Sequence, residues 1–335
     1  MTAYRDIQKI NQSCLKQILK GPQQYQKALK KMEEPSTEEH FIFGDIVDLL
    51  ITDDKDEIER KYFVMPDLNC SPIIRKIVED VYNEVSFSGA KVSDLNYYRE
   101  LILKYRQINE YDSRLKEDTA FDRIVEKGKG LFSLFKEVKG RIIISDANMA
   151  KARMAYLSLL TDEFTSPYLK KLSGDIEFLD KFVVEFKCLN TDMKGELDRV
   201  IINHTLKTIT PADFKTTGKT VYDFQFDFWK YRYDFQGATY HTGLSLNSKI
   251  KNLMNKGYNL ETFKYIVVEK DGINRPLVFN IPFDVHQIGL HGGMVKGYKY
   301  EGLIDAVERL EWHTKNEKWD YPVEYYEKKH LDILV

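Results

Sequence analysis

The sequence predicts an α/β (α+β) fold in which helices flank a central mixed β-sheet. Up to about residue 165, apolar residues recur mainly at helical spacing. From residue 166 onward, short runs rich in β-branched and aromatic residues alternate with turn signals. These later segments follow the order three strands, helix, two strands, helix, which indicates a mixed sheet with helices around it.

The composition is that of an ordinary folded protein. The 335 residues are 43% hydrophobic and 30% charged, with a net charge of −2, which is unlike disordered or membrane proteins. No C-x-x-C pair occurs among the three cysteines (Cys14, Cys70 and Cys188), so neither a disulfide framework nor a zinc or iron–sulfur site is expected. No apolar stretch approaches about 18 residues, and the first residues lack a signal core. We therefore expect a cytoplasmic protein that does not enter a membrane.

The N-terminal section is predicted to be helical. Two short helices are expected to meet at Gly21-Pro22, because proline is favoured at a helix start. A third helix is predicted to begin near His40. Its sequence, FIFGDIVDLLI, has apolar residues at helical spacing around two carboxylates, Asp45 and Asp48.

A helical insertion is predicted between residues 53 and 165. Its clearest helical patterns are YYRELILKYRQINEYDSRL and SDANMAKARMAYLSLL. We interpret the insertion as the wall of a cleft, although amphipathic helices more often serve as scaffold. The predicted organisation is therefore N-terminal helices in 1–52, the insertion in 53–165 and a sheet-bearing core in 166–335, within one compact domain.

The core is predicted to begin with an antiparallel meander of three strands. Their sequences are KFVVEFKCL, ELDRVII and LKTITPADFKT, and turn signals separate them. Pro211 lies in the third strand and cannot donate a ladder hydrogen bond, so we expect that strand to be irregular or at an edge. An aromatic-rich helix follows, in which Phe228, Tyr231 and Phe235 recur at helical spacing. Two more strands, TFKYIVVEK and PLVFNIPF, precede the terminal helix GLIDAVERLEWH.

Three charged side chains are predicted to converge on one face of the meander. Asp213 and Lys215 are two residues apart on a strand and so leave the same face, and the neighbouring strand brings Asp198 alongside them. Two converging carboxylates repel each other unless a cation lies between them, and oxygen ligands suit Mg²⁺ or Mn²⁺. An adjacent lysine can prepare an attacking water and stabilise charge on a phosphate. Alone, however, the pattern D-x(14)-D-x-K is more often an ordinary charged strand pair.

The surrounding motifs resemble a known family. GELDRV, DFKTT and YDFQGATY match in order and spacing the RecB-family and RecE-type exonucleases of the PD-(D/E)xK superfamily, whose core is restriction-endonuclease-like. In that family a helix with a Q-x-x-x-Y motif follows the D-x-K strand, and Gln236 and Tyr240 match it. An earlier G-x-x-x-H element aligns with Gly44 and Asp48, so an aspartate stands where the family has its metal-binding histidine. The opening INQSCLKQILKGPQQY also resembles the family's first helix pair.

The resemblance implies roles for specific residues. The implied metal ligands for Mg²⁺ or Mn²⁺, two ions per site, are Asp48, Asp198 and Asp213. The implied catalytic set is Lys215, Asp213, Asp198, Gln236 and Tyr240. Arg232 lies four residues before Gln236 and extends a polar helix stripe, so these two and Tyr240 are expected to bind DNA unless the stripe merely faces solvent. Glu185 is a further candidate metal contact, although such a residue is more often an ordinary surface glutamate.

The function implied by the resemblance is metal-dependent hydrolysis of DNA by an exonuclease, at double-stranded ends, in recombination or repair. It further implies a phage or prophage origin, the bacterial host cytoplasm, a single-strand annealing protein as partner and a homo-oligomer. No nucleotide cofactor is expected, because the sequence has no G-x-x-x-x-G-K-[ST] loop. Two alternatives stay open. One is a structure- or site-specific endonuclease of the same superfamily, and the other is a non-catalytic DNA-binding protein with the same fold.

Overall fold

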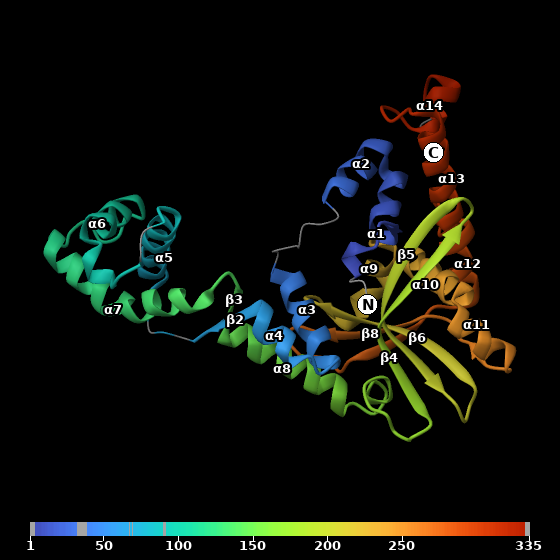
Figure 1. Cartoon of the computed structure of the whole chain (residues 1–335), viewed down its shortest axis with the longest axis horizontal. Helices are drawn as coiled ribbons and strands as arrows, with labels where there is room; N and C mark the ends of the chain where they lie inside the picture. Colours follow the sequence, from blue (N-terminus) through green and yellow to red (C-terminus); the bar gives the residue numbers. More distant parts are fainter. Residues whose placement is uncertain (1–3, 32–38, 67, 69, 90–91, 332–335) are drawn as a thin grey trace. The chain divides into compact units, whose positions relative to one another are not determined.

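The computed structural model describes residues 4–31, 39–66, 68, 70–89 and 92–331 (Figure 1). The chain forms two compact units, one made of Met1–Thr52 and Ala152–Val335 and the other of Asp53–Lys151. The second unit begins where the insertion was predicted to begin. It ends inside helix α8 (Asp146–Thr161), earlier than the predicted boundary at residue 165. The role of this unit as a cleft wall stays a prediction.

The larger unit is built around a mixed β-sheet, so the predicted fold class is confirmed. Within the described residues this sheet has seven strands, ordered β1-β5-β6-β8-β9, with β4 also paired to β5 and β7 to β6. The strands are β1 (Ile10–Asn11), β4 (Ile176–Cys188), β5 (Thr191–Asn203), β6 (Thr208–Thr217), β7 (Asn259–Leu260), β8 (Lys264–Glu269) and β9 (Leu277–Asn280). A separate hairpin is formed by β10 (Gly293–Val295) and β11 (Tyr298–Tyr300).

Strands β4, β5 and β6 form the predicted antiparallel meander. The β4–β5 ladder runs from Ile176↔Asn203 to Cys188↔Thr191. The shorter β5–β6 ladder runs from Asn203↔Thr208 to Arg199↔Ala212. Strand β6 then pairs in parallel with β8, which makes the sheet mixed.

Of the two alternatives expected at Pro211, an edge strand is wrong, but an irregularity is present. Strand β6 lies inside the sheet, between β5 on one side and β7 and β8 on the other. Pairing with β7 ends at Ile209↔Leu260, and pairing with β8 begins at Ala212↔Lys264. Pro211 therefore falls in the interval between the two partners, where its missing N–H breaks no ladder bond.

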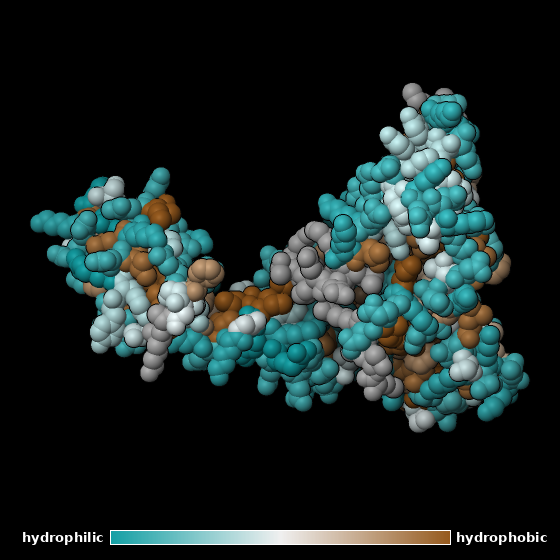
Figure 2. Space-filling model, turned by 45° about the horizontal axis from the view of Figure 1, so that its top comes forward, coloured by the Kyte–Doolittle hydropathy of each residue, from teal (hydrophilic) through white to brown (hydrophobic). Residues whose placement is uncertain are grey.

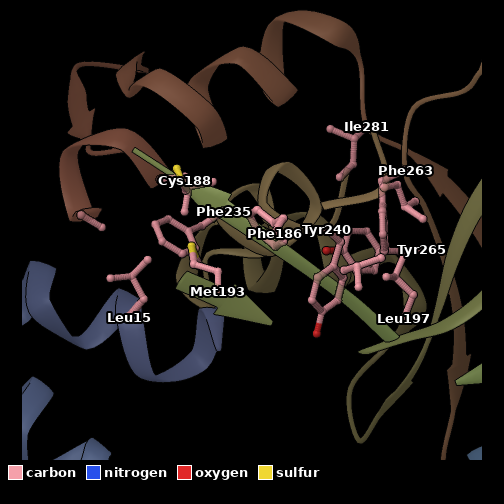
Figure 3. Close-up of a cluster of buried hydrophobic side chains, with 14 of the residues drawn as sticks. Leu15, Phe186, Cys188, Met193, Leu197, Phe235, Tyr240, Phe263, Tyr265 and Ile281 are labelled. Atoms are coloured by element: carbon pink, nitrogen blue, oxygen red, sulfur yellow. The ribbon is translucent and has the colours of Figure 1, made fainter. Parts of the chain in front are cut away.

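Helices pack around the sheet and bury its apolar side chains. They are α1 (Gln12–Leu15), α2 (Pro22–Lys31), α3 (Glu39–Ile51), α9 (Phe224–Lys230), α10 (Tyr233–Leu246), α11 (Ser248–Asn255), α12 (Phe283–His291), α13 (Leu303–Asn316) and α14 (Val323–Lys328). Short 3-10 turns lie at η1 (Tyr4–Asp6), η2 (Lys16–Lys20), η4 (Ser166–Tyr168) and η5 (Val221–Asp223). Figure 3 shows part of the core, with Leu15 of α1, Phe235 of α10 and Tyr265 of β8 among its buried side chains.

The aromatic-rich segment forms two helices instead of one. Helix α9 ends at Lys230, Tyr231 is its C-cap, and Arg232 adopts a left-handed conformation with φ 59° before α10 begins. The guanidinium of Arg232 binds the carboxylate of Asp234 at 3.0 Å and the backbone carbonyl of Glu301. The prediction of a continuous helix through Tyr231 is therefore wrong, because these contacts hold the break in place.

The second unit has its own hydrophobic core. Its elements are α4 (Lys55–Lys61), β2 (Tyr62–Met65), α5 (Pro72–Phe87), η3 (Leu95–Tyr97), α6 (Arg99–Ile108), α7 (Glu117–Val138) and β3 (Ile142–Ser145). Helices α5, α6 and α7 bury Ile77, Ile102 and Leu131 completely. The parallel pair β2–β3 was not expected in a segment predicted to be helical.

The visible surface is mostly hydrophilic, in keeping with the high content of charged residues (Figure 2). Among the described helices, none is both long enough and apolar enough to cross a bilayer.

Candidate active site

Asp198 and Asp213 come together where the β5–β6 ladder ends. The last backbone pair is Arg199↔Ala212, and the next position in that register would set Asp198 opposite Asp213. There the side chain of Asp198 replaces the ladder bond, because its Oδ2 accepts a hydrogen bond from the backbone N–H of Phe214 at 3.0 Å. The two carboxylates predicted to be neighbours therefore lie on adjacent strands at one level.

Asp213 links strand β6 to helix α10. Its side chain is almost completely buried, and its Oδ1 accepts a hydrogen bond from Nε2 of Gln236 at 3.0 Å. The ammonium of Lys215 forms an ion pair with Oδ2. The hydroxyl of Tyr265 lies 3.4 Å from Oε1 of Gln236 and donates to the carbonyl of Tyr233 at 2.9 Å. The D-x-K strand and the Q-x-x-x-Y helix thus form one hydrogen-bonded unit.

Lys215 lies between carboxylates and aromatic rings. Its Nζ is 5.3 Å from the ring centre of Tyr233 and 5.9 Å from that of Tyr265, within the range of cation–π attraction. Burial alone would lower the pKa of Lys215, but the carboxylates of Asp213 and Asp198 outweigh it and hold that pKa above the ordinary value. The side chain is therefore an ammonium group in this environment.

Asp48 joins the site from helix α3, and a second lysine lies next to it. Nζ of Lys181, on strand β4, is 3.2 Å from Oδ1 of Asp198 and 3.7 Å from Oδ2 of Asp48. The sequence analysis did not identify Lys181. The β4–β5 register would have indicated it, since continuing the register between the pairs Asp180↔Arg199 and Phe182↔Leu197 sets Lys181 opposite Asp198.

The pKa values of the three aspartates differ because the positive charges of Lys181 and Lys215 act on them to different extents. Burial, followed by the negative charge of Asp198, raises the pKa of Asp48 well above its ordinary value. Burial also raises the pKa of Asp213 to about 6, against the opposing effect of Lys215. For Asp198 the effect of burial is overcome by Lys181 and Lys215, so its pKa is lowered.

The donor atoms suit a hard divalent cation. The carboxylates of Asp48, Asp198 and Asp213 offer only oxygen, which Mg²⁺ and Mn²⁺ prefer. Oδ2 of Asp213 is buried and receives no directed hydrogen bond in the described part of the chain, although the Lys215 ammonium contacts it. Within the same described residues, no three His, Cys, Asp or Glu side chains are gathered closely enough to enclose an ion. Holding a metal ion would therefore require these side chains to rearrange.

Tyr240, the second residue of the Q-x-x-x-Y motif, is buried against strand β5. A Cβ added to Gly195 would lie 2.9 Å from two carbons of the Tyr240 ring, so only glycine leaves room for this ring. Figure 3 shows Tyr240 among the side chains of this core. Burial, followed by the charge of Asp213, raises the pKa of Tyr240 to about 12. Gln236 and Tyr240 are thus turned inward and not toward solvent.

Two other predicted site residues, Arg232 and Glu185, do not lie among the three aspartates. Arg232 precedes α10 as its N-cap and is bonded to Asp234 and Glu301, as described above. Glu185 pairs with Lys194 in the β4–β5 ladder, four residues along β4 from Lys181, and forms an ion pair with Lys9 at 3.0 Å. Four residues of strand span about 13 Å, so Glu185 is not brought to the carboxylates.

Arg199 is a further residue that the sequence analysis did not identify. Its buried guanidinium donates to the carbonyls of Tyr168 at 2.8 Å and Ile51 at 3.2 Å, and pairs with Asp180. Ile51 is the last residue of α3, three positions after Asp48. Arg199 therefore ties the helix that carries Asp48 to the strand that carries Asp198.

Comparison with known proteins identifies likenesses among solved structures. No known protein family and no curated protein matches the chain. Among solved structures, the chain is similar to a crystal structure from Eubacterium rectale that is named "Putative exonuclease". The two share 15% sequence identity with a TM-score of 0.34, over 84% of this chain and 93% of the other. Function is therefore inferred from the site geometry.

Proposed function

We propose that this protein is a divalent-metal-dependent DNA exonuclease with its catalytic centre at Asp48, Asp198, Asp213 and Lys215. One observation carries the proposal: Asp213 is bound on one oxygen by Gln236 and on the other by Lys215, while Asp198 lies beside it on the next strand. An ordinary surface strand pair would not be buried and held from two elements at once.

The proposed reaction is hydrolysis of a phosphodiester bond. When bound between Asp48, Asp198 and Asp213, Mg²⁺ or Mn²⁺, with two ions expected per site, would polarise the phosphate and acidify the attacking water. The water oxygen bonds to phosphorus as the bond to the leaving sugar oxygen breaks; the water loses a proton to solvent and the sugar oxygen gains one from solvent. The Lys215 ammonium is positioned to orient that water or a phosphate oxygen and to stabilise the growing negative charge. Gln236 keeps Asp213 in the orientation that this geometry requires.

A local group of cations supports binding of a DNA phosphate despite the net negative charge of the chain. The pKa of Lys16 is lowered to about 8, first by burial and then by the positive charges of Lys20, Lys215 and Arg232. These four cations therefore lie within electrostatic reach of one another. Lys215 and Arg232 are paired with Asp213 and Asp234, so a DNA phosphate would add to or replace these partners. Arg232 would contribute its charge, while Gln236 and Tyr240 shape the inner wall of the DNA-binding site.

Finer features of the proposal rest on the motif resemblance alone. They are a preference for double-stranded ends in recombination or repair, phage or prophage origin, and action in the bacterial cytoplasm. A single-strand annealing partner and a homo-oligomeric state belong to the same group. Glu185 is left out of the proposed metal site, because it lies four residues along β4 from Lys181 and forms an ion pair with Lys9.

The test compares an end-labelled linear duplex with a covalently closed circle, each incubated with purified protein and Mg²⁺, Mn²⁺ or EDTA. We expect the linear duplex to be digested from its ends with either metal, the circle to resist, and EDTA to stop the reaction. Equal cutting of the circle would identify an endonuclease. Binding of DNA without cleavage under all conditions would identify a non-catalytic DNA-binding protein.

A further inference from the structure

Strand β4 has an unusual backbone conformation at Lys181. Its φ is 47°, in the left-handed region, although the strand continues on both sides of it. A residue with a Cβ adopts this conformation at a cost in energy, and such residues concentrate at functional sites. Regular ladder pairs flank it at Asp180↔Arg199 and Phe182↔Leu197. The distortion is therefore confined to the one position that faces Asp198.

The side chain of Lys181 lies between two of the proposed metal ligands. Its ammonium is 3.2 Å from Asp198 and 3.7 Å from Asp48, so it contacts carboxylates from a strand and from a helix. Neither carboxylate is adjacent to it in sequence. Without a cation at this point, the two negative charges would repel each other in a partly buried place. Lys181 thus compensates the repulsion between Asp48 and Asp198. Under the proposed function, a bound metal ion would compensate the same repulsion.

A metal ion and this ammonium cannot occupy the same space. Asp48 and Asp198 would hold a shared divalent ion through their carboxylate oxygens, which approach Mg²⁺ to about 2.0–2.1 Å. Lys181 contacts an oxygen of each of these carboxylates, so its ammonium would compete with such an ion. The described carboxylates also do not enclose an ion as they stand.

We propose that Lys181 is the resident counter-ion of Asp48 and Asp198 in the metal-free protein, and that a divalent cation binds by displacing its ammonium. This assignment rests on the proposed metal-dependent function. Lys181 is then a positioning residue that holds α3 and β5 in register before the metal arrives. It lowers the affinity for the metal and takes no part in breaking the phosphodiester bond.

Metal affinity tests this proposal without any DNA. Calorimetric titration of the full chain with Mn²⁺ compares the wild type with Lys181→Asn, because asparagine tolerates the left-handed backbone and carries no charge. We expect Lys181→Asn to bind Mn²⁺ about tenfold more tightly, the size of change that loss of one contacting charge produces. Lys181→Arg keeps the charge and should bind like the wild type. Lys187→Asn removes an exposed lysine from the same strand and controls for net charge.

Thermal unfolding gives a second measurement. In EDTA, Lys181→Asn should melt at a lower temperature than Lys187→Asn, because Asp48 and Asp198 then lose the ammonium group that contacts both of them. Saturating Mn²⁺ should raise its melting temperature by more than it raises that of the wild type, since tighter binding stabilises the folded state more.

The outcomes separate this assignment from the proposed function. If the wild type cleaves DNA with Mn²⁺ but Lys181→Asn binds Mn²⁺ no more tightly than Lys187→Asn, Lys181 is not displaced and the assignment fails alone. Weaker binding by Lys181→Asn would likewise overturn it, since Lys181 would then be helping the metal to bind. If the wild type neither binds Mn²⁺ nor cleaves DNA, the proposed function and the assignment fail together.

Discussion

Gln236 donates a hydrogen bond from Nε2 to Oδ1 of Asp213 over 3.0 Å, joining helix α10 to strand β6. Both side chains are buried, and the other face of the amide is near the hydroxyl of Tyr265. A buried carboxylate loses much of its freedom when both of its oxygens have partners. The relationship explains why a glutamine on a following helix belongs to the same site as the D-x-K strand.

Replacing Gln236 by Leu removes this donor and leaves the buried Oδ1 of Asp213 without its hydrogen bond. We expect a loss of about 1–3 kcal/mol in unfolding free energy, because an unsatisfied buried acceptor is costly. Nuclease activity should fall about 100-fold, since a misplaced ligand disturbs the reacting geometry. Urea unfolding and initial cleavage rates measure the two effects. Thr242→Ala on the same helix is the control, because its hydroxyl donates to the carbonyl of Ala238. An equal loss of activity in Thr242→Ala would contradict a specific role for Gln236.

Gly195→Ala should displace the ring of Tyr240. The added methyl would lie 2.9 Å from two ring carbons, closer than real Cβ contacts, and 3.3 Å from Cγ2 of Val184, which is tight. We expect destabilisation by about 1–3 kcal/mol together with lower cleavage activity. Gly174→Ala is the matched control, because nothing lies within 4 Å of its added Cβ. Unchanged stability of Gly195→Ala in chemical denaturation would refute the close approach.

Arg199→Met should loosen helix α3. The substitution leaves the carbonyls of Ile51 and Tyr168 and the carboxylate of Asp180 without their shared cation. We expect a loss of about 2–4 kcal/mol, less than for a fully buried pair because Asp180 is partly exposed. Mn²⁺ affinity should fall as well, since Asp48 is carried on α3. Affinity equal to that of the wild type would show that Arg199 does not position Asp48.

Stability should decrease under mildly acidic conditions because of a histidine pair. The ring centres of His241 on α10 and His286 on α12 are 4.5 Å apart, and burial followed by His286 lowers the pKa of His241 from 6.5 to about 4. Between these values the unfolded chain binds the proton and the folded chain does not, so stability is lost as pH falls from 6.5 toward 4. The pKa of His286 is lowered too, by burial and then by His291, which acts in the same direction.

Urea midpoints measured from pH 7.5 to pH 4.5 test this prediction. His241→Phe should show a smaller loss of stability over that range, by on the order of 2 kcal/mol. His204→Phe, an exposed histidine outside the pair, is the control. An acid sensitivity that is the same in His241→Phe and the wild type would rule out this origin.

The parts of the structure that could be predicted from sequence depend on local signals. The meander β4–β5–β6 follows from alternating residues and turn signals, and the two-residue spacing of Asp213 and Lys215 puts them on one face. Once the meander is assumed, Asp198 must lie near them. The sheet and the centre of the candidate site were therefore within reach of sequence reasoning.

The parts that could not be predicted depend on contacts between distant segments. The break before α10 is held by a bond from Arg232 to Glu301, 69 residues away. Arg199 reaches Ile51 across 148 residues, and β2 pairs with β3 across an intervening helical section. The register of the meander could have indicated Lys181 opposite Asp198, but no local pattern indicates its left-handed backbone.

The most direct test of the proposed nuclease centre is the cleavage rate of Lys215→Ala on an end-labelled linear duplex with saturating Mn²⁺, measured together with DNA binding. Loss of the ammonium should reduce cleavage by about 10²–10⁴-fold while the Kd for DNA changes by less than about threefold. Lys219→Ala removes an exposed lysine that pairs with Asp227 just beyond β6 and should cleave like the wild type. Cleavage by Lys215→Ala at the wild-type rate would contradict the proposed centre.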